Sequence, residues 1–274
     1  MPRLKLTLAY VGAAYSGWQI QEKPSPPPTI QGELERALAG VCGRFVRVFG
    51  AGRTDAGVHA EAQVAHCDVP ALHAVNWQAA LNVKLPSDIR VLDAREVADS
   101  FDARRDARKK TYRYDLWLSR QVAPPRLAPF VWACGPLDLR RLEAALPLLT
   151  GTHDFSSFQN RGGAIRDATR TVLSLTTAHP AEFGIDVLSL YLEADGFLKQ
   201  MARNMTGLLV AVGRGGFDAS RIPALLAARE RAKAPPTAPA RGLTLVRVDY
   251  DDGGAKVLDS HAPSPSSRNV SVTA

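Results

Sequence analysis

A glycine-rich segment carries the clearest candidate for chemistry in this chain. Residues 50–60 have the sequence Gly-Ala-Gly-Arg-Thr-Asp-Ala-Gly-Val-His-Ala, which places Arg53 two residues before Asp55. Glycines tolerate positive φ and let the backbone approach a ligand closely, so this segment can present Asp55 at a cleft. A carboxylate with an ordinary pKa of about 3.9 is ionised at neutral pH and can act as nucleophile or base. The alternative is a tight Asp-Ala-Gly turn in which Asp55 bonds its own backbone and Arg53 is a solvated loop charge.

Basic and aromatic residues alternate in a second segment, Lys109–Tyr114, with the sequence Lys-Lys-Thr-Tyr-Arg-Tyr. On a strand, Tyr112 and Tyr114 point to the same face. That face would offer aromatic rings for base stacking beside charges for phosphates, as in proteins that bind single-stranded RNA. The alternative is that both tyrosines face the core and the charges only solvate a sheet edge.

A third segment, residues 196–205, contains Arg203 within a helical pattern. Met201 and Met205 begin an apolar stripe, and at about 100° per residue Arg203 lies roughly 200° from Met201, on the opposite face. Arg203 is then either a surface arginine or a cleft arginine that pairs with Asp55.

The usual cofactor motifs do not occur. Gly50 and Gly52 are followed next by Gly57, which is not a dinucleotide-binding spacing, and the sequence has no phosphate-loop GK[ST]. The three cysteines match no paired zinc-ligand spacing, and no HxxxH pair lies beside a glutamate. We therefore expect no metal and no cofactor.

The periodicity predicts two halves with the same order of elements, β-α-β-β-α-β. This order is the ferredoxin-like arrangement, and it defines an α+β fold class. Thr29 is a predicted N-cap and Pro147 is expected to kink or shorten its helix. The first half has predicted strands at 4–10, 44–49, 58–69 and 89–97 and helices at 30–41 and 75–83; the second has strands at 111–118, 170–177, 185–194 and 243–250 and helices from 139 and at 199–212.

The charge is concentrated where the two halves meet. The chain has 34 basic and 27 acidic side chains, a net charge of +7, and residues 102–113 alone contribute six basic against two acidic. We predict an N-terminal domain at 1–105, a C-terminal domain at 106–250 and a disordered tail at 251–274, where Gly, Ser and Pro are prominent. A basic surface of this kind favours a polyanionic partner.

The sequence also limits where the protein works. Its longest stretch without a formal charge, Leu6–Gln21, is 16 residues long, short of the roughly 20 that a membrane helix needs. We therefore predict no membrane span. Three cysteines are an odd number for disulfides, which favours a reducing compartment and a cytoplasmic protein.

Eight segments, in order and spacing, resemble the bacterial tRNA pseudouridine synthase A family. The most specific is GRTDAGVHAEAQVAH, which contains Asp55, and the resemblance extends over residues 1–250. The other seven are YSGWQ at Tyr15, TIQ at Thr29, FDAR at Phe101, KTYRY at Lys110, GTHDFSSF at Gly151, FLKQMARNM at Phe197 and APARGL at Ala238.

The resemblance implies a fold, a reaction and a partner. The two ferredoxin-like halves would join in one extended mixed and antiparallel sheet, with helices on one face and a basic cleft in the centre. The protein would be a homodimer that holds tRNA across both subunits. It would convert uridine to pseudouridine at positions 38, 39 and 40 of the anticodon stem-loop, an isomerisation that needs no metal or redox cofactor.

The resemblance also implies roles for individual residues. Asp55 falls on the catalytic aspartate, Arg203 on the arginine that pairs with it, and Tyr112 on the tyrosine that stacks on the target uracil. Arg53 falls on an arginine linked to flipping of the nucleotide, and Leu243 on a hydrophobic wall of the pocket. We expect further tRNA contacts from the basic residues at the junction, Arg104, Lys109 and Lys110.

Two alternatives remain at this stage. One is a pseudouridine synthase with another RNA target, and the other is an RNA-binding module without catalytic activity. A non-catalytic module would keep the basic cleft and lack the aspartate, whereas here Asp55 and its loop are present.

Overall fold

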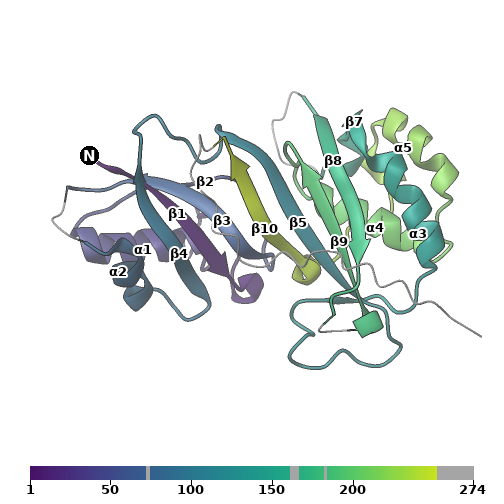
Figure 1. Cartoon of the computed structure of the whole chain (residues 1–274), viewed down its shortest axis with the longest axis horizontal. Helices are drawn as coiled ribbons and strands as arrows, with labels where there is room; N and C mark the ends of the chain where they lie inside the picture. The colour runs from purple at the N-terminus through teal and green to yellow at the C-terminus, as the bar shows by residue number, and fades with distance from the viewer. Residues whose placement is uncertain (72–74, 161–166, 182–183, 252–274) are drawn as a thin grey trace, which may run out of the picture.

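A single mixed sheet of ten strands runs through the molecule (Figure 1). The computed structural model describes residues 1–71, 75–160, 167–181 and 184–251, so the predicted tail beyond Asp251 lies outside the described residues. Within them the protein is a mixed α+β structure with five α-helices. The strand order is β4-β1-β3-β10-β5-β9-β8-β7, with β2 paired to β3 and β6 paired to β5.

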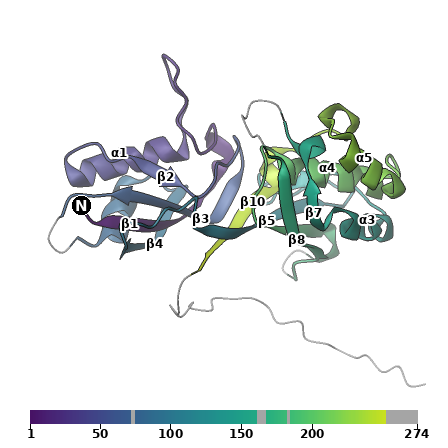
Figure 2. The same ribbon diagram turned by 90° about the horizontal axis from the view of Figure 1, so that it is seen from above.

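The first half follows the predicted order of elements. Figure 2 shows α1 lying along the strands of this half. Its elements are β1 (Arg3–Tyr10), α1 (Ile30–Cys42), β2 (Val48–Gly50), β3 (His59–Asp68), α2 (Trp77–Lys84) and β4 (Ile89–Val97).

The second half is more elaborate than the predicted β-α-β-β-α-β pattern. Helix α3 is followed by a 3-10 turn, and two short strands and one further helix are added. The elements are β5 (Ala107–Trp117), β6 (Trp132–Ala133), α3 (Leu139–Ala145), β7 (Gly151–Asp154), β8 (Thr169–Ala178), β9 (Val187–Ala194), α4 (Met201–Gly213), α5 (Ile222–Ala228) and β10 (Leu243–Tyr250).

Local chemistry sets the ends of the helices. The Thr29 side chain accepts a hydrogen bond from the Gly32 N–H at the start of α1, and Gly43 ends the helix with a left-handed φ of 68°. Asp138 caps α3 in the same way. The predicted effect of Pro147 is confirmed, because α3 stops at Ala145 and a tighter 3-10 turn follows.

The prediction of a strand over 44–49 was too long. Strand β2 begins only at Val48, which pairs with Cys67. Its partner β3 ends one residue later, at Asp68, so residues before Arg47 have no strand to pair with. The short strand β7 was missed because Gly-Thr-His-Asp has no apolar alternation, yet it pairs with β8.

Strand β10 joins the two halves of the sheet. It runs parallel to β3 through the pairs Thr244 with His59 and Leu245 with Ala60. Its other edge pairs antiparallel with β5. The first half has the order β4-β1-β3-β2 and the second the order β10-β5-β9-β8, so each half arranges its strands in the same way. The start of the chain's last strand therefore lies beside the loop that precedes β3.

Helix α4 is buried on most of its sides. The predicted apolar stripe of Met201 and Met205 is buried, but so are Asn204, Thr206 and Gly207 on other faces. The expectation of an amphipathic helix was therefore too simple, because the segment before β10 covers the face opposite the sheet. Among the described residues, no helix combines the length and apolar character needed to span a membrane.

Candidate active site

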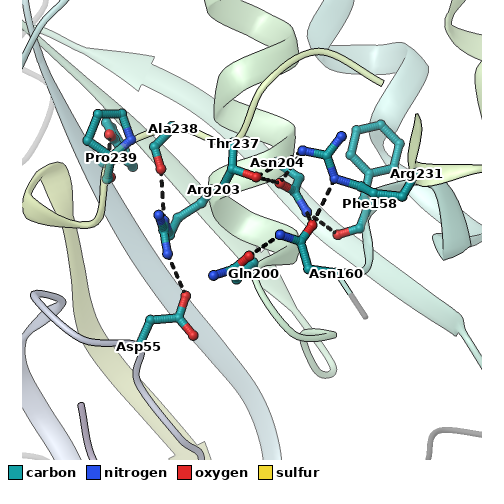
Figure 3. Close-up of polar contacts among 11 residues, drawn as sticks. Asp55, Phe158, Asn160, Gln200, Arg203, Asn204, Arg231, Thr237, Ala238 and Pro239 are labelled. Carbon is teal, nitrogen blue, oxygen red and sulfur yellow. Dashed lines mark hydrogen bonds and ion pairs between the residues drawn. The ribbon is translucent and has the colours of Figure 1, made fainter. Parts of the chain in front are cut away.

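Asp55 and Arg203 form an ion pair although they are 148 residues apart in the sequence (Figure 3). Arg203 Nη1 lies 2.8 Å from Asp55 Oδ2, and the two side chains are 14% and 28% exposed. Asp55 comes from the loop between β2 and β3, and Arg203 from the first turn of α4. The structure thus brings together a partly accessible carboxylate and a guanidinium, one from each half.

The loop around Asp55 is a tight turn braced from several sides. The Val58 N–H donates to the Asp55 carbonyl over 3.1 Å, and Gly57 adopts φ +81°, a conformation that favours glycine. The Thr54 carbonyl accepts from the Trp18 N–H at 3.0 Å, and the Thr54 hydroxyl contacts the Tyr10 hydroxyl at 2.9 Å. The Asp-Ala-Gly turn is therefore present, and its carboxylate points to Arg203.

Arg203 is held at a second point. Its Nε donates to the Ala238 carbonyl at 2.8 Å, and the Ala238 N–H donates back to the Arg203 carbonyl at 3.2 Å. A guanidinium presents its donors in a rigid plane, so two anchored donors orient the whole group. The carboxylate of Asp55 is thereby held in one direction by a charged partner.

Tyr112 lies on β5 beside this pair and is only 7% exposed. The Phe197 ring meets its ring edge-on, with 4.9 Å between the ring centres. Burial raises the pKa of Tyr112 far above its usual value, and the negative charge of Asp55 acts in the same direction. Leu243, at the start of β10, is also buried and pairs with Tyr114 on the neighbouring strand. Tyr112 thus places an aromatic ring near the carboxylate, and Leu243 is a buried apolar side chain on the neighbouring strand.

Residues 7–106 and 145–251 match the family model of tRNA pseudouridine synthase. This chain belongs to the tRNA pseudouridine synthase family. It is 51% identical to tRNA pseudouridine synthase A of Nitratidesulfovibrio vulgaris, an alignment that covers 91% of this chain and 100% of that protein. It is also 50% identical to tRNA pseudouridine synthase A of Lawsonia intracellularis, with the same coverage, and 43% identical to that of Myxococcus xanthus over 92% and 94% of the two chains. The chain is therefore an isomerase of the class that converts uridine to pseudouridine.

In this tRNA pseudouridine synthase, the two lysines predicted to contact tRNA lie on opposite faces of β5. Successive residues of a strand alternate in direction, so Lys110 shares the face of Tyr112 and Lys109 does not. Lys109 Nζ binds Glu193 at 3.0 Å on the far face. Lys110 Nζ donates to the Ala51 carbonyl at 2.7 Å, which ties β5 to the loop that carries Asp55.

Lys110 is a half-buried cation among other cations. Burial lowers its pKa to about 8, and the charges of Arg104 and Arg170 contribute to the same shift. Arg104 and Arg53 are both exposed. Exposed or half-buried positive charge therefore flanks the side of β5 that carries Tyr112.

Much of the excess charge at the junction is neutralised within the protein. Arg108 pairs with Asp251, and Lys109 pairs with Glu193. Arg113 pairs with both Glu61 and Asp115. Of these acidic partners, Asp115 is two residues from Arg113, and the others lie on other segments of the chain. The net charge of the segment alone therefore overstates how much of it faces a ligand.

His59, within the most specific motif, has a role that the sequence did not indicate. Its Nδ1 accepts from the Gly12 N–H at 3.2 Å, so Nε2 carries the proton and donates to the carbonyls of Pro129 and Arg241. Burial lowers the pKa of His59. The neutral ring joins the segments that carry Gly12, Pro129 and Arg241. The partner carbonyls lie 70 and 182 residues away, so no local pattern could reveal this role.

The described part of the chain holds no cluster of three or more His, Cys, Asp or Glu side chains arranged for a metal ion. The residues around Asp55 are instead arginines, a lysine and aromatic rings. This set suits an anionic ligand with a planar base.

Proposed function

We propose that this protein isomerises uridines at positions 38, 39 and 40 in the anticodon stem-loop of tRNA, with Asp55 as the catalytic residue. The observation that carries the proposal is the ion pair between Asp55 and Arg203, which joins the two halves beside Tyr112. Family membership supplies the reaction class, and the site supplies a carboxylate that is partly open to solvent.

The reaction needs no group beyond the protein's own side chains. It breaks the bond from C1′ of the ribose to N1 of uracil, turns the base and forms a bond from C1′ to C5. The proton on C5 is lost, and N1 gains a proton. Atoms and electrons balance between uridine and pseudouridine. The Asp55 carboxylate can attack the sugar or the base ring, or take a proton in an elimination that forms a glycal. In each route Arg203 compensates its charge and fixes its direction.

The target base must leave the helical stack before the carboxylate reaches it. We assign Tyr112 to hold the uracil while it is detached, with Leu243 as an apolar wall. Both side chains are buried in the free protein, and the charge of Asp55 acts on Tyr112. Arg53 is exposed two residues before Asp55, where it can fill the space that the flipped nucleotide leaves or contact the RNA backbone.

The surrounding architecture supports tRNA as the ligand. The equal strand orders of the two halves favour two ferredoxin-like domains, 1–105 and 106–250, with helices on one face and a basic cleft between them. Arg104 and Lys110 lie on the cleft side in this arrangement, whereas Lys109 reaches RNA only by leaving Glu193. We further propose a homodimer that works in the cytoplasm, which suits the three free cysteines.

The test is incubation with uridine-labelled tRNA, followed by mapping of the positions that become pseudouridine. Product at 38, 39 and 40 supports the proposal. Product elsewhere would identify a pseudouridine synthase with another target. Binding of tRNA without any product would favour the non-catalytic RNA-binding module.

A further inference from the structure

A cluster of buried and half-buried polar side chains lies beside the Asp55–Arg203 pair (Figure 3). We call it the Asn204 cluster; it consists of Asn160, Gln200, Asn204, Arg231 and Thr237. Asn204 follows Arg203 in the first turn of α4 and is fully buried. Its Nδ2 donates to the Phe158 carbonyl at 2.7 Å and to Asn160 Oδ1 at 3.0 Å.

Arg231 is the centre of the Asn204 cluster. Its guanidinium donates to Asn160 Oδ1 at 2.8 Å, to Asn204 Oδ1 at 3.0 Å and to Thr237 Oγ1 at 2.9 Å. It also donates to the Ala234 carbonyl at 3.1 Å. All four acceptors are neutral oxygens, and burial lowers the pKa of Arg231. Removing a charged group from water costs free energy, and neutral partners offset that cost only if their hydrogen bonds hold the group in a fixed position.

The cluster fixes both ends of the hydrogen bond from Arg203 Nε to the Ala238 carbonyl, which we call the Arg203 anchor. On one side Asn204 holds the first turn of α4, and Gln200, at the N-cap, receives a hydrogen bond from Asn160. On the other side Thr237 donates to Asn204 Oδ1 at 2.6 Å and immediately precedes Ala238, whose carbonyl accepts from Arg203. The donor and the acceptor of that anchor are therefore both attached to the same network.

The segment that carries Thr237 also passes very close to α4. A methyl group at Gly207 would lie 2.1 Å from the Pro236 carbonyl oxygen, so the segment and the helix are in direct backbone contact there. Small shifts of the segment would consequently be transmitted to Ala238. Misplacement of a catalytic group by about 1 Å can lower a rate by roughly two orders of magnitude.

We propose that Arg231 and Thr237 are positioning residues, which act on catalysis through Arg203 by fixing the Ala238 carbonyl against the first turn of α4. This inference rests on the proposed function, in which Arg203 orients Asp55. Neither residue touches Asp55, so their effect must pass through the Arg203 anchor.

The experiment measures kcat, the Kd for tRNA and the melting temperature for Arg231→Met and Thr237→Val, alone and in the Arg203→Lys background. Thr237→Val keeps the side-chain shape and removes the donor to Asn204. We expect kcat to fall about tenfold or more in the wild-type background, with the Kd for tRNA unchanged within about twofold. In the Arg203→Lys background the same substitutions should lower kcat less than about twofold, because residues that act as one unit are not additive.

The matched control is Arg141→Met, which removes an arginine from an exposed ion pair on α3 and should leave kcat unchanged. If Arg231→Met does not fold, Thr237→Val decides alone. An unchanged kcat, an equal loss in both backgrounds, or a Kd that rises in step with the loss of kcat would overturn the inference. Absence of pseudouridine with the wild-type chain would instead refute the proposed function, and with it the inference.

Discussion

The Arg203→Lys substitution tests what Arg203 contributes to the ion pair beyond its positive charge. The substitution keeps a positive charge, but lysine cannot reach Asp55 and the Ala238 carbonyl with two fixed donors at once. In the wild-type protein these contacts are both 2.8 Å long. A hydrogen bond to a charged group contributes roughly 1.5–3 kcal/mol. Loss of the hydrogen bond to Asp55 therefore corresponds to a rate reduction of about 10- to 150-fold, because each 1.36 kcal/mol of barrier changes the rate tenfold.

The assay is single-turnover formation of pseudouridine with enzyme in excess over tRNA, together with the Kd for tRNA from filter binding. We expect the rate constant to fall by this factor and the Kd to change by less than about threefold, because Arg203 is only 14% exposed and faces Asp55. Arg141→Lys, in an exposed ion pair, is the matched control. A rate within twofold of wild type would refute the reasoning, as would a loss of affinity that accounts for the whole effect.

Three other substitutions probe the surroundings of the pair. Tyr112→Phe keeps the ring and should retain tRNA binding in a binding assay; complete loss of binding would make the residue structural. Lys110 has a pKa of about 8 in the folded protein, whereas its ordinary value is 10.5. Between those pH values the folded state binds fewer protons than the unfolded state. The free energy of unfolding should therefore rise with pH across that window, by up to about 3 kcal/mol. Urea unfolding from pH 7.5 to 10.5 should show this rise in wild type and not in Lys110→Met; parallel curves would contradict the burial argument. Arg104→Gln, at an exposed position, should make the dependence of tRNA affinity on salt less steep, and an unchanged slope would place the RNA elsewhere.

Elements with a clear period were predictable from the sequence. The strands at 89–97 and 243–250 have the predicted bounds, and Thr29 caps its helix as expected. These features depend on alternation and on capping chemistry within a few residues, which a sequence displays directly.

Features that depend on distant partners were not predictable. Lys109 and Lys110 were grouped by charge, but they lie on opposite faces of the strand. Lys109 forms an ion pair with Glu193, and Lys110 donates a hydrogen bond to the Ala51 carbonyl. Arg231 was not singled out, because its partners in the Asn204 cluster lie up to 71 residues away. Contacts of this kind arise only when distant segments fold together, so no local pattern marks them.

The most direct test of the central claim is the Asp55→Asn substitution in the tRNA mapping assay. The change removes the negative charge and almost no volume, so the fold and the affinity for tRNA should be retained. We predict that the wild-type protein forms pseudouridine at positions 38, 39 and 40 and that Asp55→Asn forms none at any of them. Turnover by Asp55→Asn close to that of the wild type would contradict the assignment of Asp55 as the catalytic residue.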